Sequence, residues 1–437
     1  MNILKKLKAD VLNISWDIIG KFVVLGLNFI TSIFVARYLE PEKYGFLMYS
    51  VALISLFQII GHLGLSGLLV KSLIKHKSSR LELMGTTFWL KAIAYFFSFI
   101  SVIMYLYMKN DLDQEQFMII LIISLSLFFK PFNIIEHWFQ SQLQNKFNSI
   151  AKTTSIILGS LFKFFLIFIS ARLILFAVAT LFEAVALSVF LVIIYNFKTR
   201  IKIRSWIFSI YRARKLLSKS WKIFLGAMFA TVYLKIDQVM LNWFCGNEEV
   251  GVYAVASRFS EVWYLIPNAI VLNFFPKLIN LRENQEKAYK VKLQNLLDLL
   301  FLLALGIAII ISLSSSLIIN FLLGDQYYNS SPILAVHVWA GIFIFMRSVF
   351  SKWILIEDLL FFSFISQGVG ALTNILLNYW LIPIYGGVGA AYATLISYAF
   401  ASYFILLIHS DTRQMFLMMT KSFLSPFRLK NLINQLR

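Results

Sequence analysis

The sequence is poor in two kinds of residue, cysteine and charged residues. Cys245 is the only cysteine in 437 residues, which excludes an intrachain disulfide and a cysteine-based metal site. Charged residues make up 14% of the chain, whereas soluble domains carry about a quarter. Hydrophobic residues make up 59%. A chain of this composition is expected to lie in a membrane.

Motifs for nucleotide chemistry and metal binding are missing too. The Walker pattern Gly-x-x-x-x-Gly-Lys-Ser/Thr does not occur, so the chain is not expected to hydrolyse nucleotides through a P-loop. The glycine-rich run Gly386-Gly387-Val388-Gly389 lies between two apolar stretches and follows no soluble strand, which argues against a dinucleotide site. The five histidines have no metal-ligand spacing, and no Cys/His or Ser/His arrangement indicates a nucleophile. We therefore expect neither an enzyme nor a bound cofactor or metal.

Long apolar stretches are abundant. A membrane helix needs about 20 apolar residues, and about twelve stretches of this length follow one another between Trp16 and Ile408. The fold class is therefore an all-α membrane protein. Pro131 and Pro332 interrupt or flank the fourth and tenth stretches. The predicted spans are 16–36, 44–70, 81–108, 115–139, 148–169, 173–196, 218–244, 250–276, 291–313, 332–355, 359–382 and 388–409.

The charge pattern predicts how the chain is oriented. If the N-terminus is cytoplasmic and the spans alternate in direction, most Lys and Arg residues lie on the cytoplasmic side. This matches the tendency of basic residues to remain on the cytoplasmic side of a membrane. Nine of them lie between Lys198 and Lys222, with no acidic residue. Both termini are then cytoplasmic. We attribute the net charge of +19 to topology and contact with anionic lipid, and do not expect a nucleic-acid partner.

The two halves of the chain resemble each other. Ser15-Trp16 matches Ser220-Trp221, Gly45 matches Gly251, and Ala179-Thr180-Leu181 matches Ala393-Thr394-Leu395, all in the same order. Six spans in each half predict two six-helix lobes related by a parallel repeat, as in transporters. The alternative is that similar apolar composition produced chance matches. The predicted parts are an N-terminal lobe 1–217 that ends in a basic linker 197–217, a C-terminal lobe 218–409, and an amphipathic basic tail 410–437.

Charged side chains inside the spans are the candidate functional residues. A charge at the centre of a lipid-facing helix costs about 2.5–3.5 kcal/mol, so we expect these residues to face protein or a water-filled cavity. The basic ones predict a cationic cavity between the halves that binds an anionic group, above all a diphosphate. Three acidic residues could close the cavity by pairing, or exchange protons. The alternative is that salt bridges join helices. The basic candidates are Lys21, Lys91, Lys163, Lys235, Arg258 and Arg347, and the acidic ones are Asp17, Asp237 and Glu261.

Sequence spacing predicts partners for only some of these charges. Asp17 and Lys21 are four residues apart, and Arg258 and Glu261 are three apart, so each pair can meet on one helix. Lys235 is two residues from Asp237, which places the two on different faces, so each needs a partner elsewhere. Of the others, Lys91, Lys163, Glu183, Asp298 and Arg347 have no opposite charge within a turn, whereas Lys130 and Glu136 sit near a predicted helix end. Asn374 and Asn378 share one face of a span, where they could bind a sugar or join helices.

Three segments resemble one family. They are Ala36-Arg37-Tyr38-Leu39-Glu40-Pro41-Glu42-Lys43-Tyr44-Gly45, then Lys235-Ile236-Asp237-Gln238-Val239-Met240-Leu241 continuing to Pro267, and Asn378 to Tyr398. They are similar to the corresponding segments of bacterial O-antigen and exopolysaccharide flippases, in the multidrug/oligosaccharidyl-lipid/polysaccharide exporter superfamily. The resemblance implies the two-lobe fold of the superfamily's multidrug exporters. It carries over four candidate cavity residues, Lys235, Asp237, Arg258 and Glu261.

The resemblance also implies a function. The expected activity is the transfer of an undecaprenyl-diphosphate-linked oligosaccharide from the cytoplasmic to the outer leaflet of a bacterial inner membrane by alternating access, with possible proton or sodium coupling. The expected partners are that lipid, the bilayer and the polysaccharide polymerase machinery. Two alternatives stay open, a flippase for the peptidoglycan lipid precursor and a cation-coupled multidrug exporter. A membrane glycosyltransferase or polymerase is disfavoured by the short outer loops.

Overall fold

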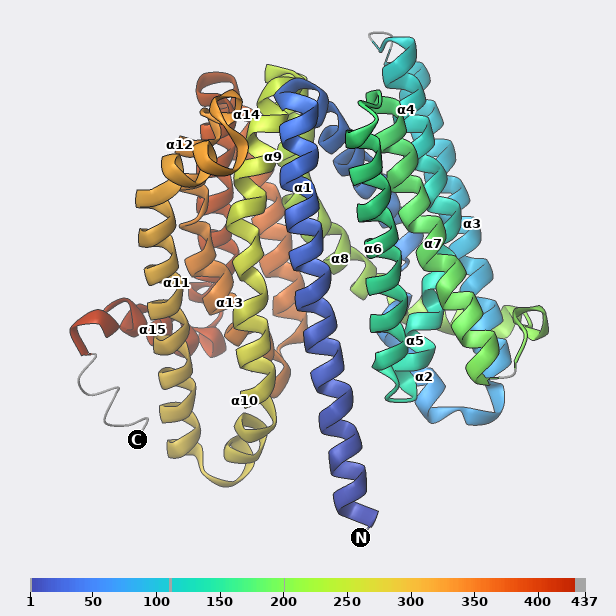
Figure 1. Ribbon diagram of the computed structural model, residues 1–437. Coiled ribbons are helices and arrows are strands. Elements are labelled where there is room, and N and C mark those ends of the chain that lie inside the picture. Colours follow the sequence, from blue (N-terminus) through green and yellow to red (C-terminus); the bar gives the residue numbers. More distant parts are fainter. Residues whose placement is uncertain (1, 110–111, 200, 429–437) are drawn as a thin grey trace. The chain divides into compact units, whose positions relative to one another are not determined.

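Every regular element in the described part of the protein is a helix (Figure 1). A computed structural model describes residues 2–109, 112–199 and 201–428, with side chains from residue 20 to residue 427 except at 110–111, 200 and 360. The chain forms two compact units, unit 1 (Met1–Thr231) and unit 2 (Val232–Arg437). The division falls within α8 (Ile210–Cys245), the helix that begins the second predicted lobe. The lobe limits predicted from sequence stay predictions.

Unit 1 is a bundle in which long and short helices are joined by short connections (Figure 1). α1 packs against both α3 and α6, and α6 packs against α7. A 3-10 segment that contains Pro131 separates α4 from α5, because proline lacks the amide hydrogen that a continuous helix needs. The helices are α1 (Asn2–His62), α2 (Leu65–Lys75), α3 (Arg80–Met108), α4 (Gln114–Ser124), α5 (Ile134–Ser141), α6 (Asn145–Phe168) and α7 (Leu173–Thr199), with 3-10 segments at Lys77–Ser79, Leu125–Asn133 and Ile203–Ser205.

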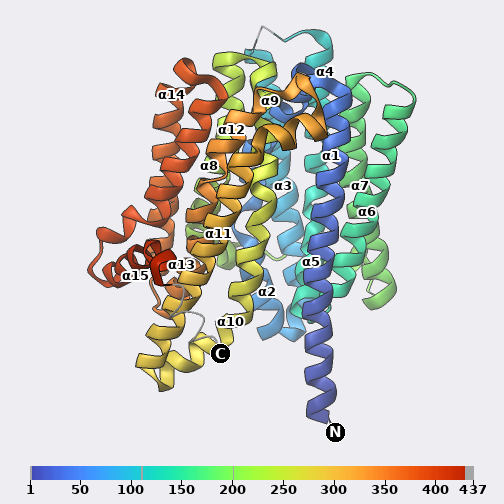
Figure 2. The same cartoon turned by 60° about the vertical axis from the view of Figure 1, so that its left-hand side comes forward.

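Unit 2 is a second helical bundle with one helix lying across it. In Figures 1 and 2, α15 runs across the direction of α11 and α13 instead of along it. Met415 and Met419 of α15 are fully buried against the core that α11 and α13 form. The helices are α9 (Asn247–Glu261), α10 (Leu265–Asn284), α11 (Glu286–Leu323), α12 (Ser330–His337), α13 (Ala340–Ile356), α14 (Leu360–Ser402) and α15 (Arg413–Phe423), with 3-10 segments at Val262–Tyr264, Asp325–Tyr327, Phe404–Leu407, Ser410–Thr412 and Ser425–Arg428.

Two of the longest helices fold back at a kink. In α1 the kink is at Glu40, whose φ of 61° is left-handed, directly before Pro41. In α14 it is at Gly386, with φ of 55°, where a side chain would also collide with the Glu249 carboxylate. Glu249 fixes this turn, because its Oε1 accepts a hydrogen bond from the Gly387 amide at 2.6 Å. Each kink lets one helix supply two arms of a bundle.

The helices present apolar side chains outward as well as inward. On α11, four large apolar residues that are 66–85% exposed recur every three or four positions, which places them on one face of the helix. Such a stripe is stable in lipid and unstable in water. Ten helical stretches in the described residues are long and apolar enough to cross a membrane. The predicted all-α membrane fold is confirmed, while the number of twelve spans stays a prediction. The exposed residues on α11 are Ile310, Leu313, Leu317 and Phe321.

The predicted basic linker is packed onto unit 1. Trp206 Nε1 donates to Tyr195 Oη at 3.2 Å, and the Trp206 ring packs edge-on against Tyr195. Arg212 forms an ion pair with Glu82 at 3.3 Å and donates to Ser79 Oγ at 2.6 Å. The linker therefore joins the fold of unit 1. In the predicted tail, α15 is helical, and the apolar residues expected from Leu429 to Leu436 lie outside the described residues.

Candidate functional site

One buried polar cluster in unit 2 is built around a carboxylate. Asp237, in the second half of α8, is 4% exposed and accepts three hydrogen bonds. Tyr253 Oη donates to it at 2.7 Å, Asn378 Nδ2 at 2.6 Å and Thr394 Oγ1 at 2.7 Å. The donors come from three different helical arms, so the cluster exists only when the bundle is assembled. We call Asp237, Tyr253, Asn374, Asn378 and Thr394 the Asp237 cluster.

The kink in α14 is what allows this cluster to form. Asn374 and Asn378 lie one turn apart on the arm before Gly386, and Thr394 lies on the arm after it. Because the helix reverses at the kink, both arms reach Asp237. Asn378 Nδ2 also donates to Asn374 Oδ1 at 3.2 Å, and both asparagines are fully buried. The turn at Gly386 therefore sets the geometry around a carboxylate far away in sequence.

All the donors to Asp237 are neutral. Within the described residues, Asp237 has no ion-pair partner, although buried carboxylates are usually paired with a cation. Two buried amide atoms beside it, Asn378 Oδ1 and Asn374 Nδ2, have no hydrogen-bond partner. A carboxylate, an amide oxygen and a hydroxyl are the oxygen ligands that a hard cation prefers. The cluster could therefore hold such a cation, or a proton on the carboxylate.

Three charged residues predicted from sequence lie near this cluster. Glu261, at the end of α9, is within electrostatic reach of Lys235, Arg258 and Asp237. Lys235, Arg258 and Glu261 are all partly buried. The expected ion pair between Arg258 and Glu261 does not form among the described residues, although their spacing permits it. The structure thus brings the four residues shared with the flippase motifs into one charged region of unit 2.

Arg347 and Asp298 form hydrogen bonds with neutral groups on neighbouring helices. Arg347 Nη1 donates to the Ala401 carbonyl at 2.7 Å and Nη2 donates to Ser366 Oγ at 3.2 Å, which joins α13 to both arms of α14. Asp298, on α11, accepts from Ser422 Oγ at 2.6 Å and from Gln294 Nε2 at 2.7 Å. Both residues connect helices within unit 2. Asp298 in particular attaches α15 to α11.

In unit 1, charged residues pair between helices. Lys163 on α6 meets Glu183 on α7 at 2.9 Å, with side chains 19% and 26% exposed. Gly159 lies against this carboxylate, and a Cβ there would be 3.0 Å from Glu183 Oε2. Lys152 on α6 meets Glu136 on α5 at 2.5 Å. These pairs supply the partners that sequence spacing could not predict for Lys163 and Glu183.

The remaining sequence candidates also belong to unit 1. Lys91, on α3, is only 3% exposed. Lys21 lines a cavity of about 230 Å³ that Glu136, His137 and Lys152 also line. The side chain of Asp17 lies outside the described residues. Three of the six predicted basic residues therefore belong to unit 1 and three to unit 2, and the prediction that they face one shared cavity stays a prediction.

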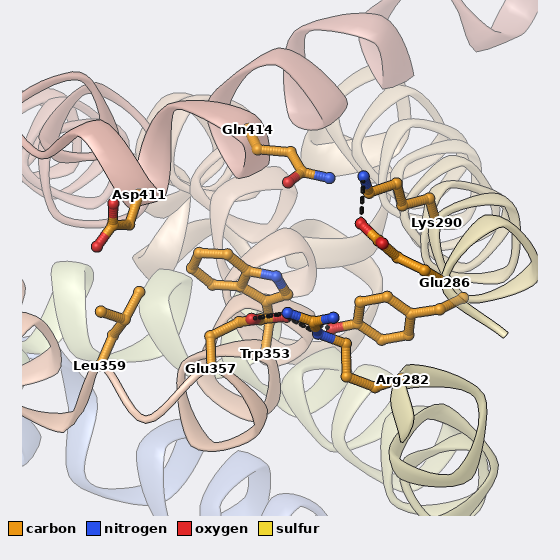
Figure 3. A pocket seen from close by; sticks show the side chains of 9 residues that line it. Arg282, Glu286, Lys290, Trp353, Glu357, Leu359, Asp411 and Gln414 are labelled. Carbon is orange, nitrogen blue, oxygen red and sulfur yellow. Dashed lines mark hydrogen bonds and ion pairs between the residues drawn. The ribbon is translucent and has the colours of Figure 1, made fainter. Parts of the chain in front are cut away.

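A separate cavity of about 160 Å³ opens at the end of unit 2 where α10 meets α11 (Figure 3). Arg282 forms two hydrogen bonds with the Glu357 carboxylate, at 2.9 and 3.0 Å, and Tyr289 Oη adds a third at 3.2 Å. Figure 3 shows Trp353 beside this pair, with Gln414 of α15 on the opposite wall. The Arg282–Glu357 pair connects the α10–α11 turn to the end of α13.

Sequence reasoning did not identify Tyr253 and Thr394 as partners of Asp237, or Lys152 as a partner of Glu136. Tyr253 and Thr394 lie in the segments that resemble the flippase family, and this resemblance could have identified them as candidates. Lys152 had no such signal, because its partner comes from a neighbouring helix. Among the described residues, no group of three or more His, Cys, Asp or Glu side chains could hold a metal. That search does not count the amide and hydroxyl oxygens of the Asp237 cluster.

Comparison with known proteins gives consistent matches. The sequence model of a family described as "Polysaccharide biosynthesis protein" matches residues 34–332. The chain is 30% identical over 185 residues to a probable flippase, AglR, of Haloferax volcanii, a match that covers 39% of this chain and 36% of that relative. It is 23% identical over 429 residues to an uncharacterised membrane protein, MJ1068, of Methanocaldococcus jannaschii, covering 88% of this chain and 81% of that one.

Solved structures show the same fold. One is the lipid II flippase MurJ in an inward closed conformation, with a TM-score of 0.72 at 17% identity, covering 93% of this chain and 90% of that one. Another is an inward-facing multidrug resistance transporter of the MATE family in the MOP superfamily. Its TM-score is 0.67 at 14% identity, covering 94% and 96% of the two chains. At these identities the likeness establishes the fold alone.

Proposed function

Because the chain belongs to the polysaccharide biosynthesis protein family, we propose that it moves a lipid-linked oligosaccharide from one leaflet of a membrane to the other. The family match over residues 34–332 carries the proposal. The proposed substrate is an undecaprenyl-diphosphate-linked repeat unit, transferred from the cytoplasmic to the outer leaflet of an inner membrane in which both termini are cytoplasmic. A polysaccharide polymerase is the proposed acceptor of the product.

Basic residues near the Asp237 cluster are the proposed contacts for the diphosphate. Lys235 and Arg258 are partly buried in membrane-length helices, and neither has a hydrogen bond or ion pair within the described residues. A charge left unpaired in a membrane helix is costly unless it faces water or a ligand. Arginine and lysine both bind phosphate oxygens, and arginine can do so with two parallel hydrogen bonds. Their availability supports a phosphate ligand at these two side chains.

The Asp237 cluster is the proposed site of the coupling ion, with Glu261 as the neighbouring acidic residue. A sodium ion would neutralise the Asp237 carboxylate and use the free oxygen of Asn378 as a ligand. A proton would also neutralise it, and would turn one carboxylate oxygen into a donor. Either ion changes the hydrogen bonds that join α8, α9 and the two arms of α14. Ion binding could thereby bias unit 2 between two arrangements during alternating access.

The test uses purified protein in liposomes with a fluorescent undecaprenyl-diphosphate oligosaccharide. We expect protein-dependent movement between leaflets, faster with a sodium or a proton gradient. The Lys235→Ala and Arg258→Ala variants should slow movement about tenfold or more, which corresponds to the loss of a charge-assisted hydrogen bond. Lys287→Ala is the matched control, because Lys287 is an exposed residue of the same unit.

Two results would overturn this proposal. Normal movement in both single variants would remove Lys235 and Arg258 from the substrate path. A protein that accumulates a cationic dye and leaves the lipid where it is would be a drug exporter. An undecaprenyl-monophosphate oligosaccharide provides a further comparison, since slower movement of this lipid would show that the second phosphate is recognised.

A further inference from the structure

Unit 1 contains a cavity with both polar and apolar walls that the proposed transport function does not use. Its volume is about 340 Å³, and its walls come from α1, α4, α6, α7 and the 3-10 segment Leu125–Asn133. A water molecule occupies about 30 Å³ of liquid volume, so the cavity has room for a small solute with several waters. The residues that determine its chemistry are Gln58, Ser126, Lys130, Lys152 and Glu183.

Three hydrogen-bond donors in this cavity have no partner among the described residues. They are the ammonium of Lys130, the amide of Gln58 and the hydroxyl of Ser126, which is 7% exposed. The other hydroxyls on the wall already donate to their own helices, as Ser55 does to the Val51 carbonyl at 2.7 Å. Lys130 can only donate, whereas Gln58 and Ser126 can donate or accept. The three groups come from two elements, α1 and the 3-10 segment Leu125–Asn133.

The charges around the cavity are unbalanced. Lys152 is paired with Glu136, and Lys163 is paired with Glu183. Lys130 and the buried Lys91 have no such pair within the described residues, and His62 lies within electrostatic reach of both. Glu136 lies within electrostatic reach of both lysines and Glu183 within reach of Lys130, but these two carboxylates face four lysines. An excess of two positive charges therefore remains in a helical bundle with elements long and apolar enough to cross a membrane. An excess charge inside such a bundle requires water, a counter-ion or both.

We propose that this cavity binds a small inorganic anion, of the size of chloride or phosphate, through Lys130, Gln58 and Ser126. The anion compensates the excess positive charge and receives hydrogen bonds from the three free donors. Lys152, which also lines the cavity, adds attraction although it is paired with Glu136, whereas Glu183 opposes binding and is itself paired with Lys163. The site lies wholly within unit 1 and does not depend on the transported substrate, so it stands or falls separately from the proposed transport function.

The experiment measures anion binding to the purified full-length protein without lipid substrate. Sodium chloride and sodium phosphate are titrated against sodium gluconate at constant ionic strength, with calorimetry and the thermal unfolding midpoint as readouts. We expect saturable binding of at least one of the two anions, with a rise in the unfolding midpoint because the ligand binds the folded state. The anion that saturates identifies the ligand's size and charge.

Variants locate the site. Lys130→Gln should weaken the saturating anion at least about tenfold, or 1.4 kcal/mol, whereas Lys130→Arg keeps the charge and should retain binding. Glu183→Gln removes the opposing charge and should tighten binding, a result that a purely structural role would not give. Lys77→Gln is the control, because Lys77 is an exposed lysine of unit 1 in a turn.

Each contrary outcome is decisive. Absence of saturable binding of both anions to the unaltered protein would show that the cavity holds water alone. Binding that survives unchanged in Lys130→Gln would place the anion elsewhere. If Lys130→Gln does not fold, an affinity unchanged in Glu183→Gln would overturn the assignment.

Discussion

The two units satisfy their buried polar groups in opposite ways. In unit 1, lysines pair with glutamates between helices, as Lys163 does with Glu183, and lysines outnumber their partners. In unit 2, the buried carboxylate of Asp237 is surrounded by neutral donors. The difference shows that two halves with similar sequence patterns do not share one kind of site. On the proposals made above, the unpaired donors of unit 1 suit an anion, whereas the Asp237 cluster of unit 2 suits a cation or a proton.

The sequence match between the two halves pairs Asp237 of unit 2 with Thr31 of unit 1. Asp237 lies fourteen residues before Gly251, and Thr31 lies fourteen residues before the matching Gly45. Thr31 is also buried, and its Oγ1 donates to Ser160 Oγ on α6 at 2.9 Å. Both positions thus carry a polar contact between two helices, but only unit 2 carries a charge there. Substitutions at the two positions test whether the contact or the charge matters.

The largest effect on stability is expected from Asp237→Val. The substitution removes the acceptor for three buried donors, each of which costs about 1–3 kcal/mol when left without a partner, so the protein should lose about 3 kcal/mol or more. Thermal and denaturant unfolding in detergent would measure the loss. Asp237→Asn, which keeps an acceptor oxygen, is the control and should lose less. Unfolding of Asp237→Val at the unaltered midpoint would contradict the role of these hydrogen bonds.

A smaller effect is expected from breaking the ion pair of unit 1. Lys163→Met leaves Glu183 without its partner, and the intermediate exposure of both side chains predicts a coupling energy of about 1–2 kcal/mol. A double-mutant cycle with Glu183→Gln measures this energy directly. The double variant should be more stable than the sum of the two single losses predicts. Simple additivity would mean that the pair contributes nothing.

The matching contact at Thr31 should contribute about 1 kcal/mol. Thr31→Val keeps the shape of the side chain and removes one neutral hydrogen bond to Ser160. The same unfolding measurement applies, together with the liposome assay. If the charge at Asp237 carries ion coupling, Thr31→Val should leave the ion dependence of transport unchanged. Loss of that dependence in Thr31→Val would show that both units take part in coupling.

The smallest effect is expected at the Arg282–Glu357 pair shown in Figure 3. Arg282 is 41% exposed, and exposed ion pairs contribute about 0–1 kcal/mol, with bidentate pairs such as this one toward the upper end. Arg282→Gln should therefore lower stability by less than about 1 kcal/mol, and the difference should shrink as salt is added. A loss of stability as large as that from Asp237→Val would mean that the Arg282–Glu357 pair stabilises unit 2 as much as the buried Asp237 cluster does.

The sequence predicted which charged residues lie near Asp237 better than it predicted their hydrogen-bond and ion-pair partners. It identified Asp237, Lys235, Arg258 and Glu261 together, and the structure places all four in one region. It could not identify Asn378 as the partner of Asp237, because the two residues are 141 positions apart. The one ion pair that spacing did suggest between described side chains, Arg258 with Glu261, does not form.

Composition and pattern alone determined that this protein is an all-helical membrane protein, because only helices satisfy the backbone of such long apolar stretches in lipid. The motifs alone indicated a resemblance to polysaccharide flippases, and the chain belongs to the family described as "Polysaccharide biosynthesis protein". Only the tertiary structure decided which buried charges are paired and which are free. A helix brings together residues three or four positions apart, whereas the partners of Lys163 and Asp237 come from other helices, which only the packing of the bundle brings into contact.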